Sequence, residues 1–122
     1  MHELSIMENV LEIVIDFSKK NHANKVKKIN LVVGSLSGII PHWAELFFQM
    51  ISRDSIAEHA TLSFDIIPAR IICRDCGAST EFTNVNMVFH CSYCGSDEVG
   101  LVSGKEFLVD SIEVIMDTTD MT

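Results

Sequence analysis

The sequence of 122 residues predicts an α+β fold, in which two helices and a small three-stranded sheet carry a cysteine-rich insertion before the last strand. Two observations support this prediction. Apolar residues recur at helical spacing in two segments and alternate with polar residues in three others. All four cysteines of the chain fall within residues 73–94. The chain length allows one domain with a small appendage.

The first helix is expected to begin just after Ser5, which leaves the opening tripeptide outside regular structure. Ser5 and Glu8 form a capping-box pattern, in which each side chain satisfies a backbone N–H of the first turn. We expect the helix to end near Asn21, where Lys19 and Lys20 suit the negative end of the helix dipole. Its apolar face at helical spacing comprises Met7, Val10, Leu11, Val14 and Phe17.

A strand and a second helix are predicted next. Ile29, Leu31 and Val33 alternate with polar residues, as in a half-buried strand, and the glycines of segment 34–38 end it. Pro41 suits the first turn of a helix, where a backbone N–H is not needed. The apolar stripe of this helix, which ordinarily faces a core, is predicted to comprise Trp43, Leu46, Phe47 and Met50.

Two further strands complete the predicted sheet. One alternates through Leu62, Phe64 and Ile66 and ends at Pro68. The last has one apolar face, formed by Leu108, Ile112, Val114 and Met116. We therefore expect residues 1–70 and 105–122 to form one α/β domain, and residues 71–104 to form a separate inserted domain.

The cysteines form two Cys-x-x-Cys pairs, Cys73 with Cys76 and Cys91 with Cys94, and a glycine follows each pair. Two such pairs separated by a loop are typical of a four-thiolate zinc site, because each turn holds two sulfurs on one side of a tetrahedral ion. Glycine can adopt the positive φ that such a tight turn needs. Four thiolates leave no open coordination position, so the predicted zinc ribbon is structural and not hydrolytic.

Three other arrangements of the cysteines compete with a zinc site. Two disulfides would need an oxidising compartment. A thioredoxin-like redox motif would place one pair on a βα turn instead of two matched pairs. A rubredoxin-like iron centre uses similar ligands, and spacing alone leaves it open.

Composition and motifs also argue against several classes of function. The formal net charge of −8 argues against nucleic-acid binding. The chain has no apolar run long enough for a bilayer and no signal-peptide pattern, so we expect a cytoplasmic protein with reduced cysteines and no membrane insertion. It has no nucleophile motif and no phosphate-binding glycine loop, so we do not expect an enzyme.

The opening tripeptide Met1-His2-Glu3 is a second candidate metal site. It offers the α-amine of Met1 and the backbone nitrogen and imidazole of His2, and Glu3 adds a carboxylate or a further amide. A planar, nitrogen-rich donor set suits divalent nickel or copper better than zinc. The alternative is that a terminal histidine is frayed and has no role.

The tripeptide, the capped helix behind it, the Val33-Gly34 strand end and the late Cys-x-x-Cys pairs together resemble the HypA/HybF family of hydrogenase nickel-insertion chaperones. The resemblance covers nearly the whole chain. It implies a nickel-binding domain, a structural zinc domain and partnership with a nickel-handling GTPase. It also implies delivery of nickel to the large subunit of a [NiFe] hydrogenase, and some members of this family also serve urease.

Under this resemblance His2 matches a nickel ligand, and the Met1 amine and Glu3 complete the set. The zinc ligands would be the four cysteines, Cys73, Cys76, Cys91 and Cys94. Some members of the family have an additional acidic nickel ligand near the start of the second helix, where this chain reads Ile39-Ile40-Pro41-His42. Whether His42 takes that place or is an exposed first-turn residue stays open. The competing hypothesis is a zinc-ribbon adaptor that binds proteins or nucleic acid and handles no nickel.

Overall fold

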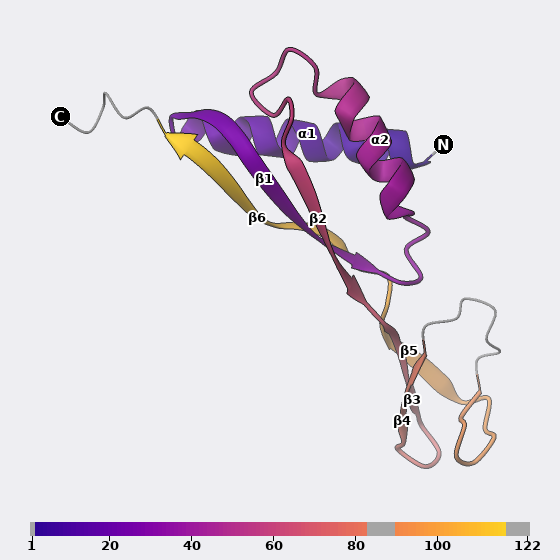
Figure 1. The fold of residues 1–122 in the computed structure, drawn as a ribbon. Coiled ribbons are helices and arrows are strands. Elements are labelled where there is room, and N and C mark those ends of the chain that lie inside the picture. The colour runs from indigo at the N-terminus through magenta and orange to yellow at the C-terminus, as the bar shows by residue number, and fades with distance from the viewer. Residues whose placement is uncertain (1, 83–89, 117–122) are drawn as a thin grey trace. The chain divides into compact units, whose positions relative to one another are not determined.

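The computed structural model describes residues 2–82 and 90–116, apart from the side chains of His2 and Phe82 (Figure 1). The described residues form two helices and six strands in two three-stranded sheets, ordered β2-β1-β6 and β4-β3-β5. In chain order the elements are α1 (His2–Lys20), β1 (Ala23–Gly34), α2 (Pro41–Ile51), β2 (Thr61–Ile67), β3 (Ala69–Cys73), β4 (Ser79–Phe82), β5 (Val99–Ser103) and β6 (Phe107–Met116). The predicted α+β class is confirmed, with the cysteine-containing sheet inserted before the last strand of the first sheet.

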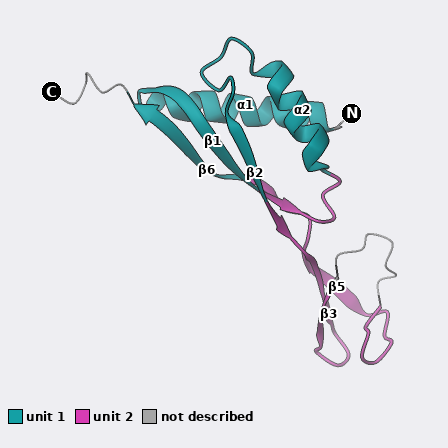
Figure 2. Ribbon diagram, viewed as in Figure 1, with its two compact units in different colours: residues 1–31, 39–64, 109–122 teal, residues 32–38, 65–108 magenta. Residues whose placement is uncertain are grey.

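The chain divides into two compact units (Figure 2). The first comprises residues 1–31, 39–64 and 109–122, and the second comprises residues 32–38 and 65–108. The second unit contains the predicted insertion of 71–104 and also residues 32–38, 65–70 and 105–108. Neither described helix is both long enough and apolar enough to cross a membrane.

Helix α1 begins at His2, so the predicted start after Ser5 is wrong. In this first turn the Glu3 carboxylate accepts a hydrogen bond from the backbone N–H of Ile40, at 3.2 Å, which ties the turn to the start of α2. The predicted end is confirmed. Asn21 donates its side-chain N–H to the Phe17 carbonyl at 2.8 Å, and His22 reverses the chain with a φ of 57°.

The buried face of α1 ends on a serine instead of an aromatic residue. Met7, Val10, Val14 and Ser18 are buried, whereas Phe17 is 49% exposed. The prediction for Phe17 is therefore wrong: consecutive positions lie about 100° apart on a helix, and Ser18 continues the Met7–Val14 line.

Helix α2 begins at Pro41 as predicted, but its predicted apolar stripe is wrong. Ala44 and Phe48 are buried, whereas Trp43, Leu46 and Met50 are 45%, 42% and 56% exposed. Apolar residues surround most of this helix, so the sequence pattern does not select a face. The helix instead packs through its small alanine and the neighbouring Phe48.

Strand β1 follows the predicted alternation, whereas β2 and β6 follow it only in part. In β2 Leu62 is buried but Ile66 is 47% exposed, so the prediction for Ile66 is wrong. The residues Ile29, Leu31 and Val33 are buried in β1, which lies at the centre of the first sheet. Strand β6 forms where expected, but Leu108 and Met116 are exposed, so their assignment to the apolar face is wrong. The alternation shifts along β6 because two successive residues, 110 and 111, are both exposed.

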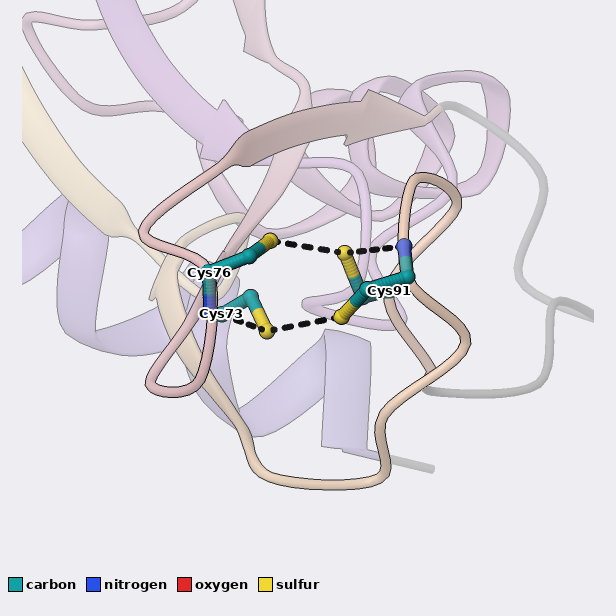
Figure 3. A group of neighbouring side chains, drawn as sticks. Cys73, Cys76 and Cys91 are labelled. Atoms are coloured by element: carbon teal, nitrogen blue, oxygen red, sulfur yellow. Dashed lines mark hydrogen bonds between the residues drawn. The ribbon is translucent and has the colours of Figure 1, made fainter.

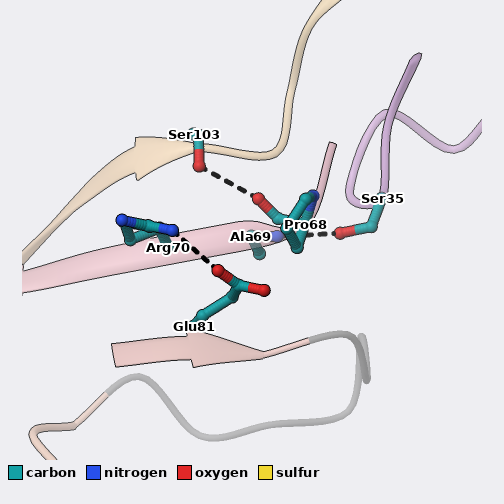
Figure 4. Close-up of polar contacts among 6 residues, drawn as sticks. All are labelled: Ser35, Pro68, Ala69, Arg70, Glu81 and Ser103. Atoms are coloured by element: carbon teal, nitrogen blue, oxygen red, sulfur yellow. Dashed lines mark hydrogen bonds and ion pairs between the residues drawn. The ribbon is translucent and has the colours of Figure 1, made fainter. Parts of the chain in front are cut away.

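The second unit is built around β3, which starts directly after Pro68, at the predicted end of β2. Ser35 accepts a hydrogen bond from the Ala69 N–H at 3.1 Å, and Ser103 donates one to the Pro68 carbonyl at 2.9 Å (Figure 4). Arg70 forms an ion pair with Glu81 on β4 at 2.7 Å. The small core of the unit consists of Ala69 and Ile71, against which Leu36 and Val99 pack.

Candidate metal centre

The two Cys-x-x-Cys segments fold into matching turns. In the first, the Gly77 N–H donates to the Cys73 carbonyl at 2.9 Å, and in the second the Gly95 N–H donates to the Cys91 carbonyl at the same distance. Both glycines have a φ of 76°, the left-handed conformation that a side chain disfavours. The predicted role of these glycines is confirmed.

The turns bring the four sulfur atoms together. The Sγ atoms of Cys73 and Cys94 lie 3.6 Å apart, and those of Cys76 and Cys91 lie 3.5 Å apart (Figure 3). All four lie within 4.8 Å of one another. A tetrahedral ion with zinc–sulfur bonds of about 2.3 Å separates its ligands by about 3.8 Å, so the cluster has nearly the required size. The cysteines are not paired as disulfides, whose sulfurs would be about 2.05 Å apart.

Backbone N–H groups favour ionisation at the first cysteine of each pair. The N–H groups of Cys94 and Tyr93 each lie 3.4 Å from the Cys91 sulfur and lower the pKa of Cys91 to about 6. The N–H of Cys76, also at 3.4 Å, lowers the pKa of Cys73. Two sulfurs are thereby prepared as thiolates, the form that binds metals.

The second cysteine of the second pair behaves oppositely. The Ser96 N–H favours the Cys94 thiolate, but the neighbouring Cys73 sulfur and partial desolvation outweigh it and raise the pKa of Cys94 to about 12. A cation among the sulfurs would supply the positive charge that lets such a thiol ionise. The four cysteine sulfurs therefore fit a divalent metal, and ionisation of all four is unfavourable without one.

Exposure differs between the members of each pair. Cys73 and Cys91 are buried, whereas Cys76 and Cys94 are exposed. Side chains also link the two turns, since Ser96 donates a hydrogen bond to Asp75. Four sulfurs complete a tetrahedral shell, so this arrangement suits a structural metal better than one that must bind a substrate.

The opening residues are described in part. Met1 lies outside the described residues, and of His2 only the backbone is described, as the first residue of α1. Glu3 is half-buried, and its Oε2 atom accepts the hydrogen bond from Ile40, the residue that caps α2. His42 lies two residues further on, exposed in the first turn of α2, with its ring edge against Trp43 at 5.2 Å between centroids.

The contact between Glu3 and Ile40 was not predicted. It brings the start of α1 to the start of α2, 37 residues apart in sequence. No local sequence pattern predicts it, because it joins two segments that meet only through tertiary packing.

The sequence was also compared with known proteins. A family model described as "Hydrogenase/urease nickel incorporation, metallochaperone, hypA" matches residues 1–114. The chain belongs to the HypA family. The hydrogenase maturation factor HypA of Aquifex aeolicus is 35% identical over 117 residues, covering 96% of this chain and 100% of that protein. HypA of Dehalococcoides mccartyi strain CBDB1 is 36% identical over 114 residues, covering 93% and 94%.

Solved HypA structures have the same fold. The solution structure of the Ni metallochaperone HypA from Helicobacter pylori aligns with a TM-score of 0.63 at 20% identity, covering 94% of this chain and 98% of that one. A second HypA solution structure aligns with a TM-score of 0.69 at 23% identity, covering 96% and 98%. At these identities the match supports the HypA fold and not individual ligands.

Proposed function

We propose that this HypA-family protein is a cytoplasmic nickel carrier. It binds Ni(II) through the Met1 amine, the backbone nitrogen and imidazole of His2, and Glu3, and releases the ion during maturation of [NiFe] hydrogenase. Cys73, Cys76, Cys91 and Cys94 hold a structural zinc ion. Its partners would be a nickel-handling GTPase and the hydrogenase large subunit, with urease maturation factors as a further candidate.

The position of Glu3 is the observation that best supports the nickel site. Its carboxylate is held by the Ile40 N–H at 3.2 Å, which fixes the first turn of α1 in place. Because α1 begins at His2, the backbone N–H groups of His2 and Glu3 are among the first four of the helix, which have no acceptor within it. These nitrogens can therefore bind an ion without breaking helical hydrogen bonds.

The start of a helix also suits the electrostatics of such a site. An amide nitrogen that binds nickel loses its proton and carries negative charge, which the positive end of the α1 dipole stabilises. Nitrogen donors in one plane are the set that nickel prefers. A site at a chain end can also release its ion with few contacts to move, as a carrier requires.

The proposed zinc has a different role. Its four thiolates would tie the turn after β3 to the turn before β5 and so hold the small second sheet together. No position remains for a substrate in such a shell, which supports a carrier and not an enzyme. The competing zinc-ribbon adaptor shares this site but needs no nickel, so the opening residues distinguish the two functions.

Replacing His2 with alanine should weaken nickel binding and leave zinc in place. Loss of a hydrogen-bond partner behind a metal ligand already costs about 10–100-fold in affinity, so loss of the ligand should cost at least that. The measurement is a calorimetric titration in which Ni(II) is added to protein that begins at Met1. The zinc content of the same protein is measured alongside. Residues added before Met1 should have the same effect, because they remove the free amine.

The matched control is His59→Asn. It removes an exposed imidazole, and asparagine tolerates the positive φ of 68° at this position. Nickel affinity should stay unchanged in this control. His42→Ala then tests the additional ligand, since a decrease would add His42 to the set. If His2→Ala binds nickel as tightly as the parent protein, the nickel site is elsewhere and the zinc-ribbon adaptor becomes the better reading.

A further inference from the structure

Helices α1 and α2 pack together in the first unit (Figure 1). A groove lies along α1 beside Ile51, the last residue of α2. It is open to solvent, has a volume of about 400 Å³, and is lined by Glu8, Leu11, Glu12, Ile15, Asp16 and Ile51. The three apolar residues are half-buried and the three acidic residues are exposed. We call this feature, an apolar floor with an acidic rim, the acidic groove.

The acidic rim is arranged regularly. Glu8, Glu12 and Asp16 are four residues apart, so their carboxylates lie on one face of α1 and repel one another. Within residues 2–82 and 90–116 the only ion pair is Arg70 with Glu81, so none of the three rim carboxylates is held in an ion pair by a described cation, and the nearest lysine in the same stripe is Lys20 at the end of α1. The stripe lowers the stability of its own helix, and neither proposed metal site uses it.

We propose that the acidic groove binds a basic amphipathic helix of a partner protein. Each residue of a helix advances about 1.5 Å along the axis, so rim carboxylates four residues apart are spaced about 6 Å along α1. Lysine or arginine at every fourth position of a second helix has the same repeat and the opposite charge. Its apolar side chains would then cover the floor formed by Leu11, Ile15 and Ile51.

Other occupants fit this surface less well. An anionic membrane would be repelled by the carboxylates of Glu8, Glu12 and Asp16. A second copy of the chain offers the basic cluster Lys25, Lys27 and Lys28, but these residues lie on β1 and not on a helix. The inference does not depend on nickel binding, because the groove shares no residue with the proposed nickel site.

The probe is a labelled helical peptide of about 16 residues, long enough to form a helix, with lysine at every fourth position and leucine on the adjoining face. Fluorescence anisotropy with the full-length, zinc-loaded protein should show binding. Raising the salt from about 0.1 M to about 1 M shortens the Debye length from about 10 Å to about 3 Å and should weaken this binding. A peptide with glutamate in place of lysine should not bind.

The triple variant Glu8→Gln, Glu12→Gln, Asp16→Asn should bind the peptide about tenfold more weakly or worse, mainly through slower association, because the three charges are exposed at the rim. It should fold well, since it removes a repulsion, and circular dichroism checks this. The matched control is Asp65→Asn, Glu98→Gln, Glu113→Gln, which changes net charge equally at three exposed positions outside the groove. The control should bind the peptide as tightly as the parent protein does. In the parent, the amide NMR shifts that change on adding the peptide should belong to α1 and Ile51.

Three results would overturn the proposal. The first is no binding of the lysine peptide at low salt. The second is an equal loss of affinity in both triple variants, which would mean a general attraction to an acidic protein. The third is a dimer of the protein, seen by sedimentation, that the triple groove variant abolishes and that the lysine peptide does not dissociate. This result would assign the acidic groove to a second copy of the chain.

Discussion

Gly34 has no room for a side chain. A Cβ atom there would lie 2.1 Å from the carbonyl oxygen of Gly104, and a Cβ at Gly104 would lie 2.8 Å from the Cα of Ala69. Three backbone segments of the second unit meet at this point, where the Leu36 N–H donates to the Gly104 carbonyl at 2.7 Å. At the residue scale, the requirement for glycine therefore comes from close backbone packing and not from turn conformation alone.

Gly34→Ala should destabilise the second unit by about 3 kcal/mol, because the added methyl group forces backbone apart. The measurement is thermal or denaturant unfolding of the zinc-loaded protein. Gly100→Ala is the matched control, since its Cβ would meet only the Arg74 side chain, at an ordinary 3.7 Å. Equal effects of the two changes would show that space at Gly34 is not limiting.

At the scale of the elements, the sheet of β4, β3 and β5 is too small to be stable by burial alone. Its core contains Ala69 and Ile71, with Leu36 and Val99 packed against them. Strand β3 pairs with both neighbours: Ala69 lies opposite Phe82 of β4, and Cys73 lies opposite Val99 of β5. The cysteine turns continue directly from these strands, so a bound metal would supply the stability that the core lacks.

Removing zinc with a strong chelator should therefore loosen this sheet selectively. Amide hydrogen exchange in β3, β4 and β5 should accelerate by orders of magnitude, while protection around Val10 and Val14 of α1 is retained. Cys91→Ser should have the same effect without a chelator. Faster exchange throughout the chain would instead show that the two units unfold as one, and no change would mean that the metal does not stabilise the sheet.

At the scale of the whole molecule, two compact units contain two candidate sites of different chemistry. The opening residues belong to the first unit, and the four cysteines belong to the second. Nickel would be held by an amine and an imidazole, which bind protons near neutral pH. Zinc would be held by thiolates, of which those of Cys91 and Cys73 have a lowered pKa.

Acidification should therefore release nickel before zinc. The reference pKa values are about 7.7–8.0 for the amine and about 6.5 for imidazole, and protons compete with nickel as the pH falls through both. Titration of fully loaded protein from about pH 8 to about pH 5, with each released metal measured, should show nickel leaving within this window and zinc remaining. Release of both metals together would contradict two independent sites.

The sequence alone determined the elements whose patterns are local. The alternation of Ile29, Leu31 and Val33 predicted the central strand, Pro41 the start of α2, and the spacing of four cysteines the sulfur cluster. Each of these three predictions depends on residues close in sequence or on the fixed coordination geometry of one metal ion. The opening tripeptide was singled out as well, although its nickel chemistry stays a proposal.

Only the tertiary structure decided which faces are buried and which distant residues meet. Trp43 and Phe48 are both apolar, and packing selected Phe48 for the core. Helix α1 starts four residues earlier than its capping pattern predicted, and the Ile40 N–H donates to the Glu3 carboxylate of this early turn. The physical reason is the same in both cases: local sequence sets periodicity and turn geometry, whereas burial and capping depend on what another part of the chain places opposite.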